Sequence, residues 1–235
     1  MRTLAVVPIK TLTEAKQRLA GALASGARQS LAQAMFSDVL ASLRRARRVD
    51  DIAVVTQDVI AEALAHSDRI TVLRDERQDG QSAAALVGIR YAVVAGYDRV
   101  LLVPGDTPLL DAAEVDDLLD RCESDKLDVA IVPDRHGTGT NALVIAPPDA
   151  MTPSFGPDSL ARHVGLATDG DLDHRVEDVA SLAHDIDTPE DLAALYSALA
   201  RVRSQAPRTT GALRQLERSG AYHGNGGAVH ESVRV

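Results

Sequence analysis

The chain has 235 residues, of which 45% are hydrophobic and only 3% are aromatic, so its core must be built mainly from Ala, Val, Leu and Ile. This length fits a single domain of roughly 100–200 residues followed by a tail. The formal net charge of −9 argues against a nucleic-acid partner, because phosphate backbones are bound by basic surfaces.

The single cysteine, Cys122, excludes an intramolecular disulfide and fits a reducing compartment. No apolar run reaches the roughly 18–20 residues that a membrane-spanning helix needs, and the first residues lack a signal-peptide pattern. We therefore expect a cytoplasmic protein without a membrane partner. Its oligomeric state is not readable from the sequence, which leaves a homodimer open.

Apolar runs of strand length alternate along the chain with stretches of helical periodicity. Strands are expected at 4–7, 52–56, 70–73, 100–103, 129–132 and 142–145. Helices are expected within 12–48 and at 59–65, 81–95, 112–122 and 189–199, and a further helix is expected to start near 158. This alternation predicts an α/β fold with a mostly parallel sheet. Ligands of such sheets bind beyond the carboxyl ends of the strands, so the residues after Val7, Thr56, Val103 and Val132 should face one crevice.

The character of the sequence changes near Arg201, where hydrophobic periodicity fades. We expect a domain over 1–200 and a mostly disordered tail over 201–235, with at most a short helix around Leu213 and Leu216.

Three basic residues follow the first expected strand: Lys10, Lys16 and Arg18. Converging near the carboxyl end of that strand, they could neutralise a triphosphate, with Arg18 able to bind two oxygens at once. A solvated helix face is the alternative interpretation.

An apolar strand ends in Pro104-Gly105-Asp106, and a carboxylate at such a position needs a cation to offset its desolvation. Mg²⁺ prefers one or two carboxylates together with phosphate oxygens, so Asp106 suits a metal–nucleotide site. Capping of the next helix is the alternative, but Asp111 is better placed for it.

A second pair of carboxylates, Asp185 and Asp187, precedes the last expected helix. In a strand these alternate residues would point the same way, so one of them could complete a metal site with Asp106. Thr188 can cap the helix at the same time.

Three loops carry further candidates for ligand binding. Gly80, Gln81 and Ser82 open a helix and could meet the edge of a base, although a simple cap by Asp79 or Ser82 is equally compatible. Thr138 and Thr140 alternate with glycines between two strands, which suits an anion cradle or a plain hairpin turn. Gly156 and Ser159 lead into a helix whose free N–H groups could attract phosphate, and a plain capped helix is the alternative.

Taken in order, the motifs Val-Pro-Ile-Lys, Val-Pro-Gly-Asp-Thr-Pro, Asp-Arg-His-Gly-Thr-Gly-Thr-Asn, Phe-Gly-Pro-Asp-Ser and Asp-Ile-Asp-Thr-Pro-Glu-Asp-Leu resemble a known pattern. They are similar to those of the phosphoenolpyruvate and 2-phospho-L-lactate guanylyltransferases of deazaflavin coenzyme biosynthesis. The resemblance covers residues 4–199 and implies a three-layer, Rossmann-like nucleotidyltransferase fold.

The resemblance also implies a reaction, in which GMP passes from GTP to a small phosphorylated carboxylic acid. With phosphoenolpyruvate the products are enolpyruvoyl-diphospho-guanosine and pyrophosphate, on the route to coenzyme F-420. The alternative acceptors are 2-phospho-L-lactate and 3-phosphoglycerate. A nucleotidyltransferase with another acceptor and a non-catalytic nucleotide-binding module are the rival interpretations, although the glycine-rich loop usual in sugar and molybdopterin enzymes is absent after the first strand.

The motifs carry the family's roles to residues of this chain. The catalytic residues would be Lys16, Arg18 and Asp106, and the ligands of Mg²⁺ would be Asp106 and Asp187, with Asp185 as a further candidate. The acceptor acid would lie against Thr138, Thr140, Gly156 and Ser159. The nucleotide would contact Pro8, Lys10, Lys16, Gly80, Gln81, Ser82, Pro104 and Gly105, although the family more often has Gly-Leu-Asn at the turn that starts with Gly80. His163 is expected to be a positioning or helix residue, because the acceptor phosphate is its own nucleophile and needs no catalytic base.

Overall fold

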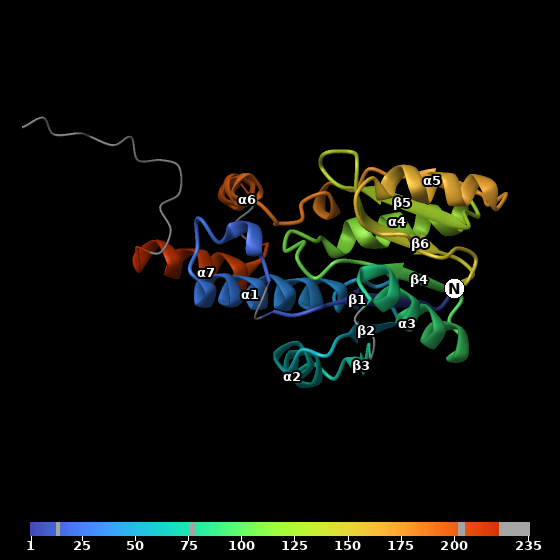
Figure 1. Ribbon diagram of the computed structural model, residues 1–235. Helices are drawn as coiled ribbons and strands as arrows, with labels where there is room; N and C mark the ends of the chain where they lie inside the picture. Colours follow the sequence, from blue (N-terminus) through green and yellow to red (C-terminus); the bar gives the residue numbers. More distant parts are fainter. Residues whose placement is uncertain (13–14, 76–78, 202–204, 221–235) are drawn as a thin grey trace, which may run out of the picture.

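The computed structural model describes residues 1–12, 15–75, 79–201 and 205–220, and it contains a seven-stranded sheet (Figure 1). The strands are β1 (Thr3–Pro8), β2 (Asp51–Val55), β3 (Thr71–Leu73), β4 (Arg99–Leu102), β5 (Val129–Pro133), β6 (Thr140–Ile145) and β7 (His174–Val176). Their order across the sheet is β3-β2-β1-β4-β6-β5-β7. β6 runs antiparallel to β4 and β5, whereas the pairs β1–β2, β1–β4, β2–β3 and β5–β7 are parallel. The prediction of an α/β fold with a mostly parallel sheet is confirmed.

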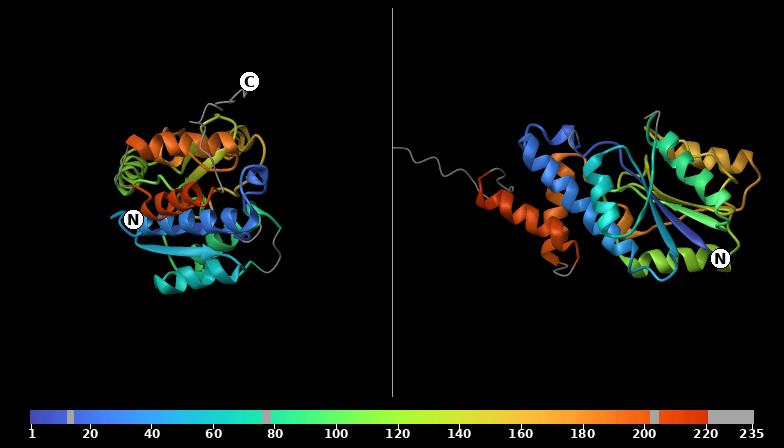
Figure 2. Two further views of the ribbon diagram at one scale, coloured as in Figure 1. Left: turned by 90° about the vertical axis from the view of Figure 1, so that its left-hand side faces the viewer. Right: turned by 90° about the horizontal axis from the view of Figure 1, so that it is seen from below.

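The helices cover both faces of the sheet, as the views in Figures 1 and 2 show. They are α1 (Ser25–Leu43), α2 (Val59–Ser67), α3 (Gln81–Val94), α4 (Ala112–Ser124), α5 (Ser159–Asp169), α6 (Pro189–Arg201) and α7 (Pro207–Arg218), with short 3₁₀ turns at Gln17–Leu19 and Ala180–Leu182. One core cluster joins the sheet to α1, α2 and α4, and a second joins it to α3 and α5. The result is a three-layer arrangement.

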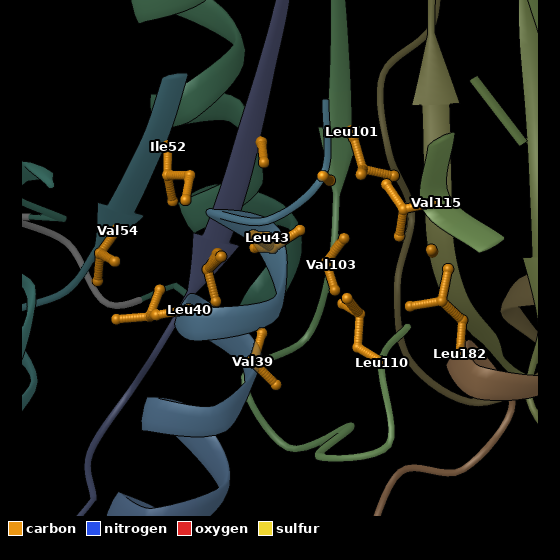
Figure 3. Close-up of a cluster of buried hydrophobic side chains, with 14 of the residues drawn as sticks. Val39, Leu40, Leu43, Ile52, Val54, Leu101, Val103, Leu110, Val115 and Leu182 are labelled. Carbon is orange, nitrogen blue, oxygen red and sulfur yellow. The ribbon is translucent and has the colours of Figure 1, made fainter. Parts of the chain in front are cut away.

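The central strands are apolar on both faces because both faces are covered. In β1, Ala5 and Val7 point to the cluster under α1, and Leu4 and Val6 point to the cluster under α3. Figure 3 shows the first cluster, with Leu40 and Leu43 of α1 packed toward Ile52 and Val54 of β2. These uninterrupted apolar runs are the reason that the strands could be located from sequence.

The close packing of α3 against β1 depends on Gly88. A Cβ atom at Gly88 would lie 2.3 Å from Cγ1 of Val6, so α3 could not pack this closely with any larger residue. This contact sets the distance between the middle of α3 and β1.

The helix expected within 12–48 is α1, which begins at Ser25 and is preceded by a 3₁₀ turn. β7 was not expected, because its His-Arg-Val sequence is short and largely exposed. Residues 184–187, considered from sequence as a strand, are not part of the sheet.

Helix α7 lies in the region that was expected to be disordered. It packs against α1, and Leu213 and Leu216 join Leu31 and Met35 of α1 and Leu192 of α6 in a third core cluster. The short helix that the sequence left possible around Leu213 and Leu216 is therefore present, and it extends over Pro207–Arg218 because α1 supplies an apolar surface for the two leucines. Residues 202–204 and 221–235 lie outside the described residues. None of the helices in the described ranges is both long and apolar enough to cross a membrane.

Asp38 of α1 holds the start of α7. This buried carboxylate accepts hydrogen bonds from the backbone N–H of Thr209 at 2.7 Å and of Arg208 at 3.2 Å. It therefore satisfies two of the amide groups that every helix start leaves unpaired.

We expect Asp38→Ala to lower the free energy of unfolding by roughly 1–2 kcal/mol, because it removes a helix cap and leaves buried amides unpaired. Urea unfolding measures the loss, and hydrogen exchange should locate it in α7. The control is Glu217→Ala at the exposed end of the same helix. Unchanged exchange in α7 of Asp38→Ala would contradict this account of its attachment.

Candidate active site

The carboxyl ends of β1, β2 and β4 open onto a cavity of about 690 Å³. Its walls include Pro8 at the end of β1, Gln57 after β2, Pro104 after β4 and Asp134 in the β5–β6 hairpin. The predicted shared crevice is therefore present. Its volume suits a ligand the size of a nucleotide, since ligand pockets commonly measure about 300–1,000 Å³.

All but one of the predicted site residues line this cavity. Those present are Pro8, Lys10, Lys16, Arg18, Gly80, Gln81, Pro104, Gly105, Asp106, Thr138, Thr140, Gly156, Ser159, Asp185 and Asp187. The exception is Ser82, whose hydroxyl accepts a hydrogen bond from the backbone N–H of Phe155 at 2.8 Å. Ser82 thus ties the start of α3 to the loop before α5 and does not form part of the cavity wall.

Lys16 lies between two of the predicted carboxylates. Its ammonium group donates to Asp106 and to Oδ1 of Asp187, the latter at 2.9 Å, and its side chain is only 7% exposed. Burial alone would lower the pKa of Lys16, but the two carboxylates outweigh it and raise the pKa. Lys16 therefore stays charged at neutral pH.

The backbone places Lys16 there by an uncommon conformation. Lys16 has φ 59° and ψ 42°, in the left-handed region that residues with a side chain seldom adopt. This turn starts the 3₁₀ segment Gln17–Leu19 and sends the side chain to the carboxylates. The ion pairs offset the cost of the conformation.

Asp185 adds a third carboxylate to this end of the cavity. Burial raises its pKa, the negative charge of Asp106 raises it further, and a hydrogen bond from Asn141 opposes both. Asp185 and Asp187 were expected to point the same way. Both side chains do line the cavity, and Ile186 between them is buried, although the segment is not a strand. In the described part of the chain, no three His, Cys, Asp or Glu side chains lie around one point as a metal-binding group.

The other two predicted cations are more exposed. Arg18 lines the cavity with its side chain 76% exposed, and Nη1 lies 4.0 Å from Oδ2 of Asp187. Lys10 is exposed where it lines the cavity. The expected convergence of the three cations on one cavity is confirmed, with Lys16 at its buried end.

Three amides of the β5–β6 hairpin are bound within the hairpin itself. Oδ1 of Asp134 accepts the backbone N–H of Thr138 at 3.0 Å and of His136 at 3.2 Å, and the carbonyl of Asp134 accepts that of Gly137. These three amides of the expected cradle are not available to an anion, because the hairpin is organised around Asp134, whose side chain binds amides that follow it. The carboxylate crowds Gly139, where a Cβ atom would lie 2.7 Å from Oδ2 of Asp134.

Two of the amides at the start of α5 are also paired within the protein. Ser159 N–H donates to the carbonyl of Gly156 and Leu160 N–H to the carbonyl of Thr138. Asp158 precedes the helix in a left-handed conformation and does not cap it with its side chain. Arg162 faces the backbone of the preceding loop, donating from Nη2 to the carbonyl of Ser154 at 2.9 Å, and is not part of the cavity wall.

Sequence reasoning missed one residue on the side of the cavity formed by β2 and β3. Asp75, which follows β3, is buried and lines the cavity. Gln57, expected in the crevice because it follows Thr56, donates to the carbonyl of Asp75. The position of Asp75 beyond the end of a parallel strand was a usable signal. It was overlooked because no recognisable motif surrounds it.

Asp191 links the segment that carries Asp185 and Asp187 to the β5–β6 hairpin. Its buried carboxylate accepts the backbone N–H of Asp187 at 3.0 Å and of Thr188 at 2.7 Å, and forms an ion pair with Arg135 at 2.5 Å. Burial would raise the pKa of Asp191, but these hydrogen bonds and the charge of Arg135 lower it. Thr188 in return accepts the Asp191 N–H at 3.2 Å, which confirms it as the cap of α6.

Comparison with known proteins agrees with this geometry. Residues 3–199 match the family described as guanylyl transferase CofC like. The chain belongs to this family of guanylyltransferases. The match begins at β1 and ends within α6, so it spans all the segments that line the cavity.

Relatives of this guanylyltransferase carry two names. A phosphoenolpyruvate guanylyltransferase from Conexibacter woesei is 46% identical over 93% of this chain and 98% of its own length. One from Sphaerobacter thermophilus is 40% identical over 82% of this chain and 91% of its own length. A 2-phospho-L-lactate guanylyltransferase from Methanothermobacter thermautotrophicus is 34% identical over 82% of this chain and 83% of its own length.

Solved structures share the fold of the guanylyltransferase at low sequence identity. A protein from Desulfovibrio desulfuricans G20 matches with a TM-score of 0.74 at 20% identity, over 93% of this chain and 96% of its own. A nucleotidyl transferase from Methanothermobacter matches with a TM-score of 0.63 at 17% identity, over 85% of this chain and 98% of its own. The Rossmann-like nucleotidyltransferase fold predicted from the sequence is confirmed.

We expect Asp191→Ala to destabilise the guanylyltransferase by roughly 2–4 kcal/mol, because it leaves Arg135 and two amides without their partner. Urea unfolding gives the value. Glu190→Ala, at the exposed neighbouring position of α6, should cost only a few tenths of a kcal/mol. Equal losses in the two variants would show that Asp191 does not have this linking role.

Proposed function

We propose that this guanylyltransferase transfers GMP from GTP to phosphoenolpyruvate, giving enolpyruvoyl-diphospho-guanosine and pyrophosphate. The observation that carries the proposal is the 46% identity to the Conexibacter enzyme over 93% of the chain. A cavity with a cation at its buried end, a carboxylate toward β3 and hydroxyl groups toward α5 supports it.

The proposed step is a single displacement at phosphorus. A phosphate oxygen of phosphoenolpyruvate forms a bond to the α-phosphorus of GTP, and the bond from that phosphorus to the oxygen bridging to the β-phosphate breaks. The electron pair leaves with pyrophosphate, and no proton has to be removed because the nucleophile is already an anion. Rate enhancement then rests on alignment and on neutralisation of charge.

Lys16 and Arg18 supply positive charge for this step. Lys16 lies in the cavity wall and remains charged, so it can bind the phosphate oxygens on which charge develops. Arg18, largely exposed, can turn to the departing pyrophosphate.

We further propose Mg²⁺ as the metal of the reaction, held by Asp106 and Asp187. The donor set fits, since hard carboxylate oxygens from two segments already converge on one cation, the Lys16 ammonium. The raised pKa of Asp185 reflects buried negative charge that a divalent cation would relieve, so Asp185 is a further candidate ligand. When bound, Mg²⁺ supplies charge neutralisation on the triphosphate and takes its remaining ligands from it.

The guanine base would lie on the side of the cavity formed by β2, β3 and the start of α3. Guanine offers two donors on one edge, N1–H and the 2-amino group, and a buried carboxylate is a good acceptor for both. Asp75 is such a carboxylate in the cavity wall, and Gly80 and Gln81 lie on the same side.

The acceptor acid would lie opposite, against Thr138, Thr140, Gly156 and Ser159. We place the reaction in the cytoplasm, where GTP is made, and in the biosynthesis of coenzyme F-420.

The assay for the proposal is pyrophosphate release with GTP and Mg²⁺ from phosphoenolpyruvate, 2-phospho-L-lactate and 3-phosphoglycerate. We expect the highest kcat/KM with phosphoenolpyruvate. 2-Phospho-L-lactate is the second candidate, because a relative with that name is 34% identical. Asp106→Asn should retain the fold and lose roughly 10²–10³-fold in kcat. No release with any of the three acids would overturn the proposed function.

Base selection gives a separate prediction. We expect Asp75→Asn to lower the kcat/KM ratio of GTP over ITP roughly tenfold, because ITP lacks the 2-amino group and a hydrogen bond to a charged acceptor contributes about 1.5–3 kcal/mol. Asp79→Asn, an exposed carboxylate outside the cavity wall, is the matched control. An unchanged GTP/ITP ratio in Asp75→Asn would mean that the base is recognised elsewhere.

A further inference from the structure

His163 of α5 joins two segments of the cavity wall. Its ring is fully buried, with Nε2 2.8 Å from the backbone nitrogen of Ser154 and Nδ1 2.9 Å from Oγ1 of Thr140. The edge of the ring meets Phe155, with 5.2 Å between the ring centroids. Neither the cavity wall nor the proposed reaction includes the ring itself.

The partner of Nε2 determines where the ring carries its hydrogen. A backbone N–H can only donate, so Nε2 must accept and is unprotonated. Burial, together with the nearby charge of Arg162, lowers the pKa of His163 to about 4, so the ring is neutral at pH 7. The single hydrogen is therefore on Nδ1, which donates it to Oγ1 of Thr140.

The Thr140 hydroxyl must then direct its own hydrogen away from His163. Thr140 lines the cavity, and within the described ranges the structure gives its hydroxyl no other hydrogen-bond partner. Five neighbouring amides, those of His136, Gly137, Thr138, Ser159 and Leu160, are already paired inside the protein. The hydroxyl is thus a donor that this wall still offers to a ligand.

We infer that His163 is a positioning residue that locks the Thr140 hydroxyl as a hydrogen-bond donor to the phosphorylated acid. The inference rests on the proposed function, and it assigns His163 to acceptor binding and not to proton transfer. A hydroxyl whose hydrogen points in a fixed direction favours a ligand group that can only accept a hydrogen bond, such as a phosphate or carboxylate oxygen. A freely rotating hydroxyl would have to be ordered on binding.

A purely structural role is the competing explanation. His163 also anchors the loop before α5 through Ser154, and Arg162 anchors the same loop from the adjacent position. The test must therefore separate the bond to Thr140 from the bond to Ser154. Two amide side chains do so: Asn can place a donor where Nδ1 lies, and Gln can place an acceptor where Nε2 lies.

The experiment measures KM for phosphoenolpyruvate and for GTP in Thr140→Val, His163→Asn, His163→Gln and the double variant Thr140→Val/His163→Gln, with thermal unfolding as the folding control. We expect Thr140→Val and His163→Gln each to raise the KM of the acid roughly tenfold, the effect of losing one hydrogen bond to a charged group. His163→Asn should stay within threefold. The KM of GTP should change less than twofold throughout.

The double variant gives the decisive comparison, because the effects of replacing two residues that act through one hydrogen bond are not additive. We expect it to match Thr140→Val alone. Multiplied effects in the double variant, or an equal loss in His163→Asn and His163→Gln, would overturn the inference. If His163→Gln does not fold, a KM for the acid retained in His163→Asn but raised in Thr140→Val supports the inference, and equal increases overturn it.

A measurement without turnover separates this inference from the proposed function. Nitrogen NMR of the His163 ring at pH 7 should show a protonated Nδ1 and an unprotonated Nε2. The opposite tautomer or a doubly protonated ring would overturn the inference even in an active enzyme. Absence of pyrophosphate release with every acid would instead overturn the proposed function.

Discussion

The ion pairs of Lys16 with Asp106 and Asp187 are the interaction on which the rest of the site depends. They join three segments that are far apart in sequence: the turn after β1, the end of β4 and the approach to α6. Removing Lys16 would leave two neighbouring carboxylates without the cation that pairs with both of them. The same cluster concentrates fixed charge where a triphosphate needs it, so folding and the proposed chemistry use one set of contacts.

Polar side chains hold the loops around that cluster in place. Asp134 gathers the hairpin amides, Asp191 links the hairpin to the Asp187 segment, and Ser82 links α3 to the loop before α5. Satisfied polar networks of this kind fix one geometry, because any alternative leaves buried groups unpaired. In consequence the cavity presents mostly side chains to a ligand, and the direction of a single hydroxyl such as that of Thr140 becomes significant.

Much of this arrangement could be predicted from the sequence. Continuous apolar runs located β1, β2 and β4, and the rule for parallel sheets then located the cavity at their carboxyl ends. What the sequence could not supply depends on partners distant along the chain. The two leucines of α7 acquire meaning only against α1, and Asp75 follows a short strand without a motif. The amides of the hairpin resembled an anion cradle because nothing in the sequence shows that Asp134 turns back to bind them.

Pyrophosphate release by Lys16→Met, with saturating GTP, phosphoenolpyruvate and Mg²⁺, tests the central claim most directly. The matched control is Lys126→Met, because Lys126 is also left-handed, with φ 55°, but is exposed and outside the cavity. The account predicts a fall in kcat of roughly 10²–10³-fold for Lys16→Met in a folded protein and less than twofold for the control. A folded Lys16→Met variant that keeps kcat within threefold of the wild type would contradict it.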